Sequence, residues 1–194
     1  MQLVKEFYKL MHDEFEMSLM RDLNYFLGLQ IKQLKEGTFV CQAKYCHELL
    51  KRFEMIDSKS IDTLMSTNGN LERDEHGKHV DIKMYRSMTR YFEYPIVSRP
   101  AIMFSVCMCA RYQLAPQESH LKAVKRILRY LYDTSKYRLW FSKGINCSLV
   151  GYSDSDFLGC KLDRKSTSGT SHFFLNSLVS WHNKKQFSVA SSTS

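Results

Sequence analysis

The spacing of apolar positions changes twice along the first part of the chain. A helical period near the N-terminus predicts an amphipathic helix whose apolar face is formed by Leu3, Phe7, Leu10, Met11 and Phe15. Between Leu27 and Ile31, apolar and polar residues alternate as in a strand; residues 35–37 supply a turn, and 38–42 return as a second strand. The pattern becomes helical again from Ala43 to Met55.

Residues from Asp57 to Val80 are polar and turn-rich, with no apolar period, which indicates a linker or a long loop. Beyond this segment, helices are predicted over 84–94, 101–114 and 117–132. The pattern then favours three antiparallel strands, at 148–152, 171–175 and 178–181. We therefore expect an α+β protein divided into 1–56, a linker over 57–83, a helical part over 84–147 and a β part over 148–194.

Composition and charge narrow the class of protein. The 194 residues are 44% hydrophobic, enough for a buried core, and the charged N-terminal residues predict neither a signal peptide nor a membrane span. The six cysteines form no CxxC pair, so we expect free thiols in a reducing compartment, cytoplasmic or nuclear, and no membrane partner. A net charge of +8 favours nucleic acid as a partner, although a solvated basic surface would give the same charge.

Basic and apolar residues separate onto different faces of the predicted helix 117–132. Spacings of i, i+3, i+4 and i+7 place four cations on one face: Lys122, Lys125, Arg126 and Arg129. Another face is apolar and consists of Leu121, Val124, Leu128 and Leu131. A basic helical face can follow a phosphate backbone, each contact adding roughly one unit to the salt dependence of binding. The alternative is a basic face that is merely solvated.

Two acids near the C-terminus, Asp154 and Asp156, lie two residues apart in a strand-like run, so their side chains share one face of the pleat. Paired carboxylates suit a divalent metal ion. The basic, hydroxyl-rich stretch that follows offers donors to a phosphate backbone through Lys161, Arg164 and Lys165. For Asp163, in the same turn, we expect a hydrogen-bonding role that stabilises the fold.

The segments GYSDSDFLGC, DRKSTSG and SLVSWHNKKQFSVASSTS resemble the opening of the RNase H domain in the Pol polyprotein of copia-type LTR retrotransposons, especially plant elements. The resemblance extends backwards, in order, through ESHLKAVKRILRYL, SRP, YRSM, GTFV and YFLGLQ. It implies the end of a reverse transcriptase palm, a primer-grip hairpin, a helical thumb and connector, and an incomplete RNase H-like antiparallel sheet. In the hairpin, Phe26, Leu27 and Gly28 would face the primer strand. Judged from its own residues alone, the run YFLGLQ predicts an ordinary half-buried hairpin.

Both activities of this family resemble catalysis by paired Mg²⁺ ions, and the resemblance matches Asp154 to the first metal-binding carboxylate of RNase H. Asp156 would be an outer or structural residue. The sequence contains no YVDD-type motif, and the remaining RNase H acids are expected past Ser194. We therefore expect a truncated Pol fragment, inactive alone, that holds Mg²⁺ at most weakly through Asp154. The parent activities would be RNA-directed DNA synthesis and degradation of the RNA strand of a hybrid, in a virus-like particle.

Two further classes stay open. The chain could be a non-catalytic module that binds an RNA–DNA hybrid or other nucleic acid through the 122–129 helix and the 161–165 turn, or a fragment that docks onto intact Pol or onto itself through an unfinished sheet edge. The chain also departs from the family pattern at Arg90, Glu93 and Pro95. We expect each of them to destabilise the fold: Arg90 by overfilling a helix contact, Glu93 as a buried carboxylate and Pro95 as a proline inside a helix.

Overall fold

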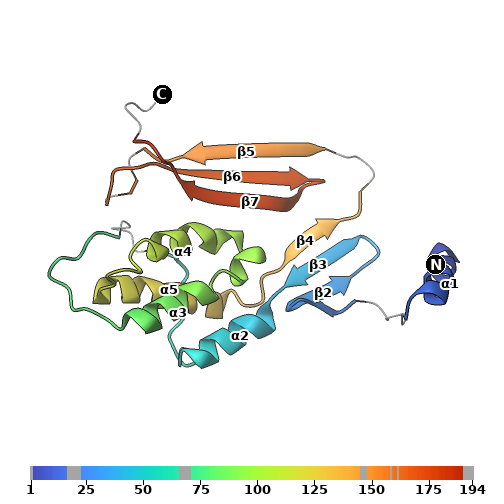
Figure 1. Cartoon of the computed structure of the whole chain (residues 1–194), viewed down its shortest axis with the longest axis horizontal. Coiled ribbons are helices and arrows are strands. Elements are labelled where there is room, and N and C mark those ends of the chain that lie inside the picture. Colours follow the sequence, from blue (N-terminus) through green and yellow to red (C-terminus); the bar gives the residue numbers. More distant parts are fainter. Residues whose placement is uncertain are drawn as a thin grey trace.

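The computed structural model describes residues 2–16, 23–65, 71–144, 148–157, 159–160 and 162–189. Across these residues the chain forms helices and two antiparallel sheets, which confirms the α+β class (Figure 1). The helices are α1 (Gln2–Glu14), α2 (Ala43–Arg52), α3 (Ile82–Tyr91), α4 (Met103–Ala110) and α5 (Glu118–Asp133), with 3₁₀ turns η1 (Pro95–Val97) and η2 (Pro100–Ile102). The strands are β1 (Tyr25–Phe26), β2 (Leu29–Gln33), β3 (Gly37–Cys41), β4 (Leu139–Ser142), β5 (Leu149–Ser155), β6 (Thr167–Phe174) and β7 (Ser177–Lys185).

The first sheet has the strand order β1-β2-β3-β4. Its β2–β3 pair confirms the hairpin that the alternating pattern predicts. The strand β4 was not expected, because it lies in a part of the chain that we predicted to be helical. It pairs with β3, where Trp140 packs against Phe39 with ring centroids 4.4 Å apart. Gly37 allows this approach, since a Cβ at Gly37 would collide with the Trp140 ring.

A tight turn at Leu27 and Gly28 joins β1 to β2, whereas the alternating pattern predicts a strand from Leu27 onwards. The two residues have φ values of 46° and 76°. Two positive φ values in succession are typical of the two-residue turns that match the twist of a hairpin. The prediction is therefore corrected at these two residues, and β2 begins at Leu29.

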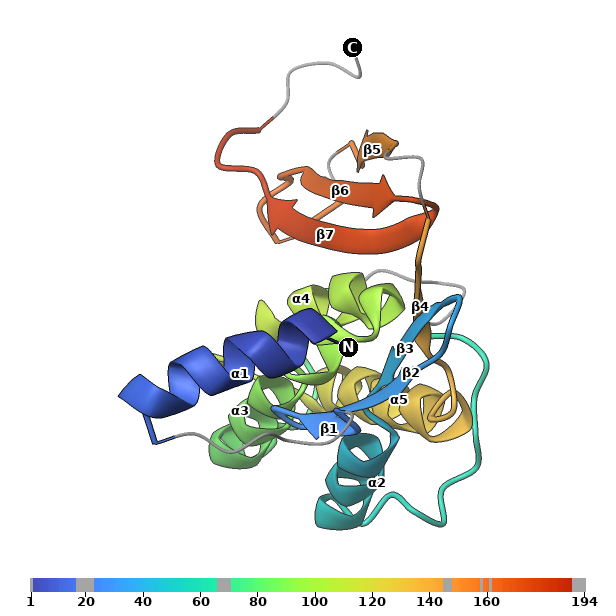
Figure 2. The same cartoon turned by 90° about the vertical axis from the view of Figure 1, so that its right-hand side faces the viewer.

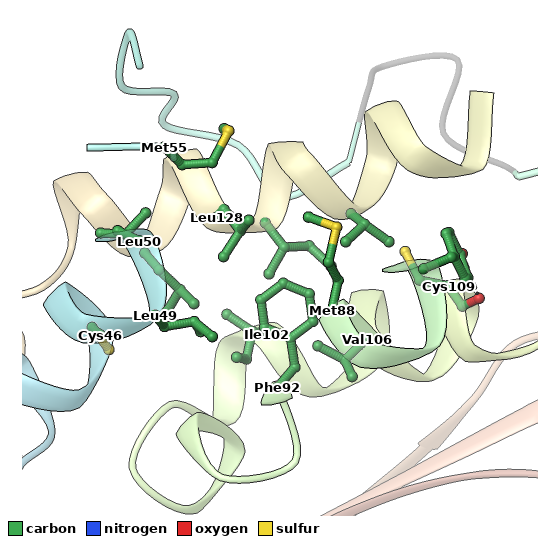
Figure 3. Close-up of a cluster of buried hydrophobic side chains, with 14 residues drawn as sticks. Cys46, Leu49, Leu50, Met55, Met88, Phe92, Ile102, Val106, Cys109 and Leu128 are labelled. Carbon is green, nitrogen blue, oxygen red and sulfur yellow. Dashed lines mark hydrogen bonds between the residues drawn. The ribbon is translucent and has the colours of Figure 1, made fainter. Parts of the chain in front are cut away.

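Helices α2, α3, α4 and α5 surround one hydrophobic core (Figure 3). The buried members of this core are Cys46, Leu49, Leu50, Met55, Tyr85, Met88, Phe92, Ile102, Val106, Cys109, Val124, Ile127, Leu128 and Leu131. They come from both sides of the polar segment 57–83, so the helices before and after this segment share their apolar interior. Burial of such side chains is the main source of folding free energy.

The last two predicted helices are present with altered ends. The helix expected over 101–114 is the turn η2 followed by α4, which ends at Ala110. The helix expected over 117–132 is α5, and its apolar face is confirmed, because Val124, Leu128 and Leu131 are fully buried and Leu121 packs against the core. Ile127 is a further buried residue of this face.

The helix predicted over 84–94 instead ends at Tyr91, and the departures from the family pattern fall at or beyond its last turn. Arg90 and Glu93 are exposed, and Pro95 is the first residue of η1, a position where proline is well tolerated. The expectation that these residues cause an overfilled contact, a buried carboxylate and a mid-helix proline was therefore wrong.

The polar segment 57–83 lies against α5 in its described parts. Nδ1 of His120 accepts from the backbone N–H of Gln117 at 3.0 Å, so Nε2 carries the proton and donates to the carbonyl of Glu72 at 2.8 Å. The hydroxyl of Tyr112 donates to the carbonyl of Leu71, and the N–H of Glu118 donates to the carbonyl of Lys78 at 2.9 Å. Backbone carbonyls of a polar segment thus satisfy donors at the start of α5 and the end of α4.

The second sheet has the order β5-β6-β7, which confirms the three antiparallel strands predicted near the C-terminus. Figure 2 shows β7 nearest to the helices and β5 farthest from them. The Trp181 indole N–H donates to the carbonyl of Ile96 at 3.2 Å, and Arg111 Nη2 donates to the hydroxyl of Thr167 at 2.9 Å. These contacts join the sheet to η1 and to the end of α4.

The helix α1 confirms the amphipathic helix predicted at the N-terminus, and Figure 1 shows it apart from the helical core. None of its described side chains is buried, and Leu3 is 80% exposed. Within the described parts of the chain, no helix is both long and apolar enough to cross a membrane.

Candidate nucleic-acid interface

The hairpin matched to a primer grip presents apolar side chains at its tip. Phe26 is 52% exposed and Leu27 is 73% exposed. Gly28 approaches the helical body so closely that a Cβ there would collide with the Tyr94 hydroxyl. Near the base of the tip, the Lys44 ammonium lies 5.9 Å from the centroid of the Tyr25 ring. The tip is therefore an exposed apolar ridge anchored to the segment that follows α3.

The basic face predicted for α5 is present, but its four cations have different surroundings. Lys122 is exposed and forms an ion pair with Glu118 at 3.3 Å, while Lys125 is half-buried. Arg126 Nε donates to the carbonyl of Thr63 at 3.0 Å, and its Nη2 donates to the Thr63 hydroxyl. In Arg129 the Nε atom is buried and has no hydrogen-bond partner among the described residues.

A groove of about 890 Å³ runs between this face of α5 and the polar segment. Lys122, Arg126 and Arg129 line one side, and Arg73 adds a further cation. The same groove is lined by the acids Glu72, Asp74 and Glu75. Acidic side chains so close to the cations reduce the positive potential along the groove, so the basic face is less cationic than the helix sequence alone predicts.

Asp154 and Asp156 do not form a joint carboxylate pair. Asp154 is exposed, and its Oδ1 accepts from the neighbouring N–H of Ser155 at 2.8 Å. Asp156 Oδ1 accepts from the backbone N–H of Thr167. This is the structural role that we expected for Asp156. Among the described acids, none is therefore oriented with Asp154 toward a shared ion.

The residues around Asp154 do not fit a pair of Mg²⁺ ions. Magnesium requires an octahedron of oxygen ligands, usually with more than one carboxylate for two ions. Among the described residues, no three side chains of His, Cys, Asp or Glu come close enough to hold a metal ion.

The turn after β5 is held together by Asp163, as the sequence predicts. Its Oδ2 accepts from the Lys185 ammonium at 2.8 Å, and its Oδ1 accepts from the N–H of Lys165 at 3.4 Å. The Lys185 ammonium lowers the pKa of Asp163 to about 2. Arg164 is exposed at a φ of 54°, whereas Lys161 lies outside the described residues. The structure thus places the basic turn at the end of the second sheet and the basic face of α5 in the helical body.

Comparison with known proteins decides the family. The chain is 36% identical over 172 residues to the retrovirus-related Pol polyprotein from transposon RE1 of Arabidopsis thaliana, a match that covers 89% of the chain. It is 32% identical over 191 residues to the corresponding polyprotein from transposon RE2 of the same plant. The chain belongs to the copia-type Pol polyproteins.

An uncharacterised mitochondrial protein of Arabidopsis thaliana is also similar, at 30% identity over 92% of this chain and 74% of its own length. The Pol segment described here spans only 12% of the RE1 polyprotein and 13% of the RE2 polyprotein. No family model matches the chain. A search of solved structures found no match either.

Sequence reasoning missed one set of candidate binding residues in this Pol segment. Three cations of α3, Lys83, Arg86 and Arg90, line a second groove of about 750 Å³ together with tyrosines from α2 and from the end of α3. The signal is present in the run KMYRSMTRY, where the cations are spaced i, i+3 and i+7. The groove itself cannot be predicted from this run, because Tyr45 on α2, which lies far away in the sequence, completes it.

Proposed function

We propose that the chain is a piece of retrotransposon Pol from the region where reverse transcriptase continues into RNase H, and that it binds nucleic acid without cleaving it. The order of the matching motifs supports the placement, because it runs from the hairpin of β2 and β3 to Asp154 without interruption. Similarity to two plant Pol polyproteins over most of the chain supports its origin in Pol.

The observation that carries the binding proposal is the line of cations on α5. Lys122, Arg126 and Arg129 line an open groove and Lys125 lies on the same helical face, while the opposite side of α5 is fixed in the core. The exposed ion pair of Lys122 with Glu118 is weak in water, so Lys122 can exchange its partner for a phosphate at little cost. A rigid row of cations of this kind follows a phosphate backbone without reading its sequence.

The carboxylate arrangement is the reason to propose binding without cleavage. Asp154 stands alone on the exposed strand β5, and Asp156 is occupied by the backbone of Thr167. One carboxylate holds Mg²⁺ weakly, because water must supply the other ligands of the ion. No second carboxylate at Asp154 is then present to hold a second ion among the described residues. The segment therefore contributes Asp154 to a site that further carboxylates would have to complete.

Binding is tested with a fluorescently labelled RNA–DNA hybrid, titrated with the chain in 50 mM and 200 mM salt without divalent ions. The double variant Lys122→Gln with Lys125→Gln should weaken binding about tenfold in the lower salt and reduce the salt slope by roughly two units. The matched control is Lys59→Gln with Lys136→Gln, which removes the same charge from exposed positions outside α5 and its groove. Equal losses in the two double variants would contradict the proposal, because they would indicate general attraction to net charge.

A second candidate function, docking onto intact Pol or onto a second copy, is favoured by the edge strand β5. Within the described residues β5 pairs only with β6, and all of its seven residues are exposed. Leu149 and Tyr152 therefore place apolar side chains beside a row of unpaired backbone groups. Edges of this kind accept a further strand.

Docking through β5 is tested by the concentration dependence of the apparent mass in size-exclusion chromatography with light scattering. Replacing Ser153 by Pro removes a backbone N–H that points away from β6, and it should abolish association if the edge carries it. The control variant Val179→Pro introduces proline into β7 instead. Association that persists in Ser153→Pro would contradict docking through this edge.

A further inference from the structure

The second groove, beside α3, combines an aromatic floor with a cationic rim. Tyr45 and Tyr94 meet edge to face, with ring centroids 4.6 Å apart. The Tyr45 hydroxyl donates to the carbonyl of Tyr91 at 3.1 Å, and burial raises the pKa of Tyr45, which keeps this donor protonated. The carbonyl of Tyr94 accepts from the side-chain amide of Gln42 at 3.2 Å. These contacts fix the Tyr45 ring and the backbone that carries Tyr94 before any ligand arrives.

The cations on the rim have few competing partners. Lys83 and Arg90 are exposed, and neither forms an ion pair with another described residue. Arg86 donates through Nε to the carbonyl of Gln113 at 3.0 Å, which orients its guanidinium without neutralising it. Glu93 is the acid that lines this groove. Three cations against one carboxylate give the rim a positive potential, in contrast to the mixed charges beside α5.

From this geometry we infer that the α3 groove is a binding site for single-stranded nucleic acid. The tyrosines of the floor stack an unpaired base, and Lys83, Arg86 and Arg90 hold the adjacent phosphates. Stacking on aromatic side chains beside a cationic track is the general means of binding single strands without sequence preference. A volume of about 750 Å³ also suits one or two nucleotide units better than a helical duplex.

A duplex cannot use this site in the same way. Its bases are stacked on one another and present only their edges, so the faces of the tyrosine rings would have no partner. An unpaired nucleotide presents both a base face and a phosphate to one small groove. The α3 groove therefore adds a single-strand site to the hybrid-binding face proposed on α5, and the two grooves share no lining residue.

The test uses the full chain and labelled ten-nucleotide strands, dT10 and rU10, by fluorescence anisotropy in 50 mM salt. An abasic ten-nucleotide strand carries the same phosphates without bases and should bind at least about tenfold more weakly than dT10. The double variant Lys83→Gln with Arg90→Gln should weaken dT10 binding about tenfold, since it removes two phosphate contacts. These exposed, unpaired side chains can be replaced without disturbing the core, and circular dichroism checks that the fold is kept.

The matched control is Lys59→Gln with Lys136→Gln, which removes the same charge at exposed positions that line neither groove, and it should weaken dT10 binding much less. A wild-type chain that binds dT10 but not the RNA–DNA hybrid would overturn the proposal for α5 and keep the one for the α3 groove. Equal affinity for the abasic strand would overturn the inference, because a phosphate-only site needs no aromatic floor. Equal affinity for an oligoglutamate of the same charge would overturn it in favour of an acidic peptide site.

Discussion

The carboxylate of Asp156 accepts a hydrogen bond from the N–H of Thr167, and the N–H of Asp156 donates to the carbonyl of Thr167 at 3.1 Å. This two-way contact fixes the end of β5 against the start of β6. Asp154, two residues earlier, is exposed and bonds only to the N–H of its neighbour Ser155 among the described residues. The two acids look equivalent in the sequence, but Asp156 has a structural role whereas Asp154 is exposed.

Replacing Asp156 by Ala should destabilise the fold by about 1–3 kcal/mol, because the buried N–H of Thr167 would lose its partner. Asp154→Ala is the matched control and should change the free energy of unfolding by less than about 0.5 kcal/mol. Urea denaturation followed by tryptophan fluorescence measures both. A larger loss in Asp154→Ala than in Asp156→Ala would refute the division of roles.

The ion pair between Asp163 and Lys185 should make stability depend on pH in the acid range. Lys185 lowers the pKa of Asp163 from 3.8 to about 2, so the folded state favours the ionised carboxylate. This contribution is present above pH 4 and is lost as the pH falls from about 4 toward about 2. Both side chains are about one third exposed, which keeps the effect small.

The measurement for this ion pair is the urea midpoint between pH 2 and pH 5 for the wild type and for Asp163→Asn. The variant should show a shallower decline at low pH, because its side chain does not titrate. Parallel curves for the two proteins would show that the pair contributes nothing to the acid sensitivity.

The turn at the tip of the β1–β2 hairpin should tolerate no side chain at Gly28. Gly28→Ala would place a Cβ against the Tyr94 hydroxyl at a φ of 76°, which should cost about 1 kcal/mol or more. In Gly169→Ala the new Cβ would meet its nearest atom, the carbonyl oxygen of His182, at an ordinary 3.8 Å. We expect a lower thermal midpoint for Gly28→Ala only. A similar loss in both variants would contradict the requirement for glycine at this turn.

The core shared by α2, α3, α4 and α5 should be sensitive to truncation on α5. Leu128→Ala removes a fully buried side chain and should cost about 2–5 kcal/mol in the free energy of unfolding. Leu114→Ala is the control, since Leu114 is 76% exposed. If Leu128→Ala unfolds the chain completely, the milder Ile127→Val should still cost about 0.5–1.5 kcal/mol.

Local patterns in the sequence predicted the elements well where a single segment decides its own structure. The helices containing Leu49 and Val124 follow from periodicity, because burial of one face requires that period. The strands around Tyr152 and Trp181 follow from runs of residues that favour strands. The strand β4 could not be found in this way. Its structure depends on pairing with β3 and on the contact of Trp140 with Phe39, which lie far apart in the sequence.

The candidate site shows the same limit. The spacing of Lys122 and Arg126 correctly placed them on one face of α5, but the acids Glu72 and Asp74 that line the same groove come from a segment expected to be a linker. Likewise, the buried glutamate expected at Glu93 followed from a helix that in fact ends at Tyr91. Charge balance in a groove depends on which segments meet there, and tertiary packing decides this.

The central claim is that this Pol segment binds nucleic acid without cleaving it. The most direct measurement incubates the chain with a hybrid labelled on its RNA strand in excess Mg²⁺, and follows binding and strand length together. The account predicts a bound hybrid whose RNA remains full length, with the same result for Asp154→Asn. Cleavage of the RNA by the wild type that is lost in Asp154→Asn would contradict it.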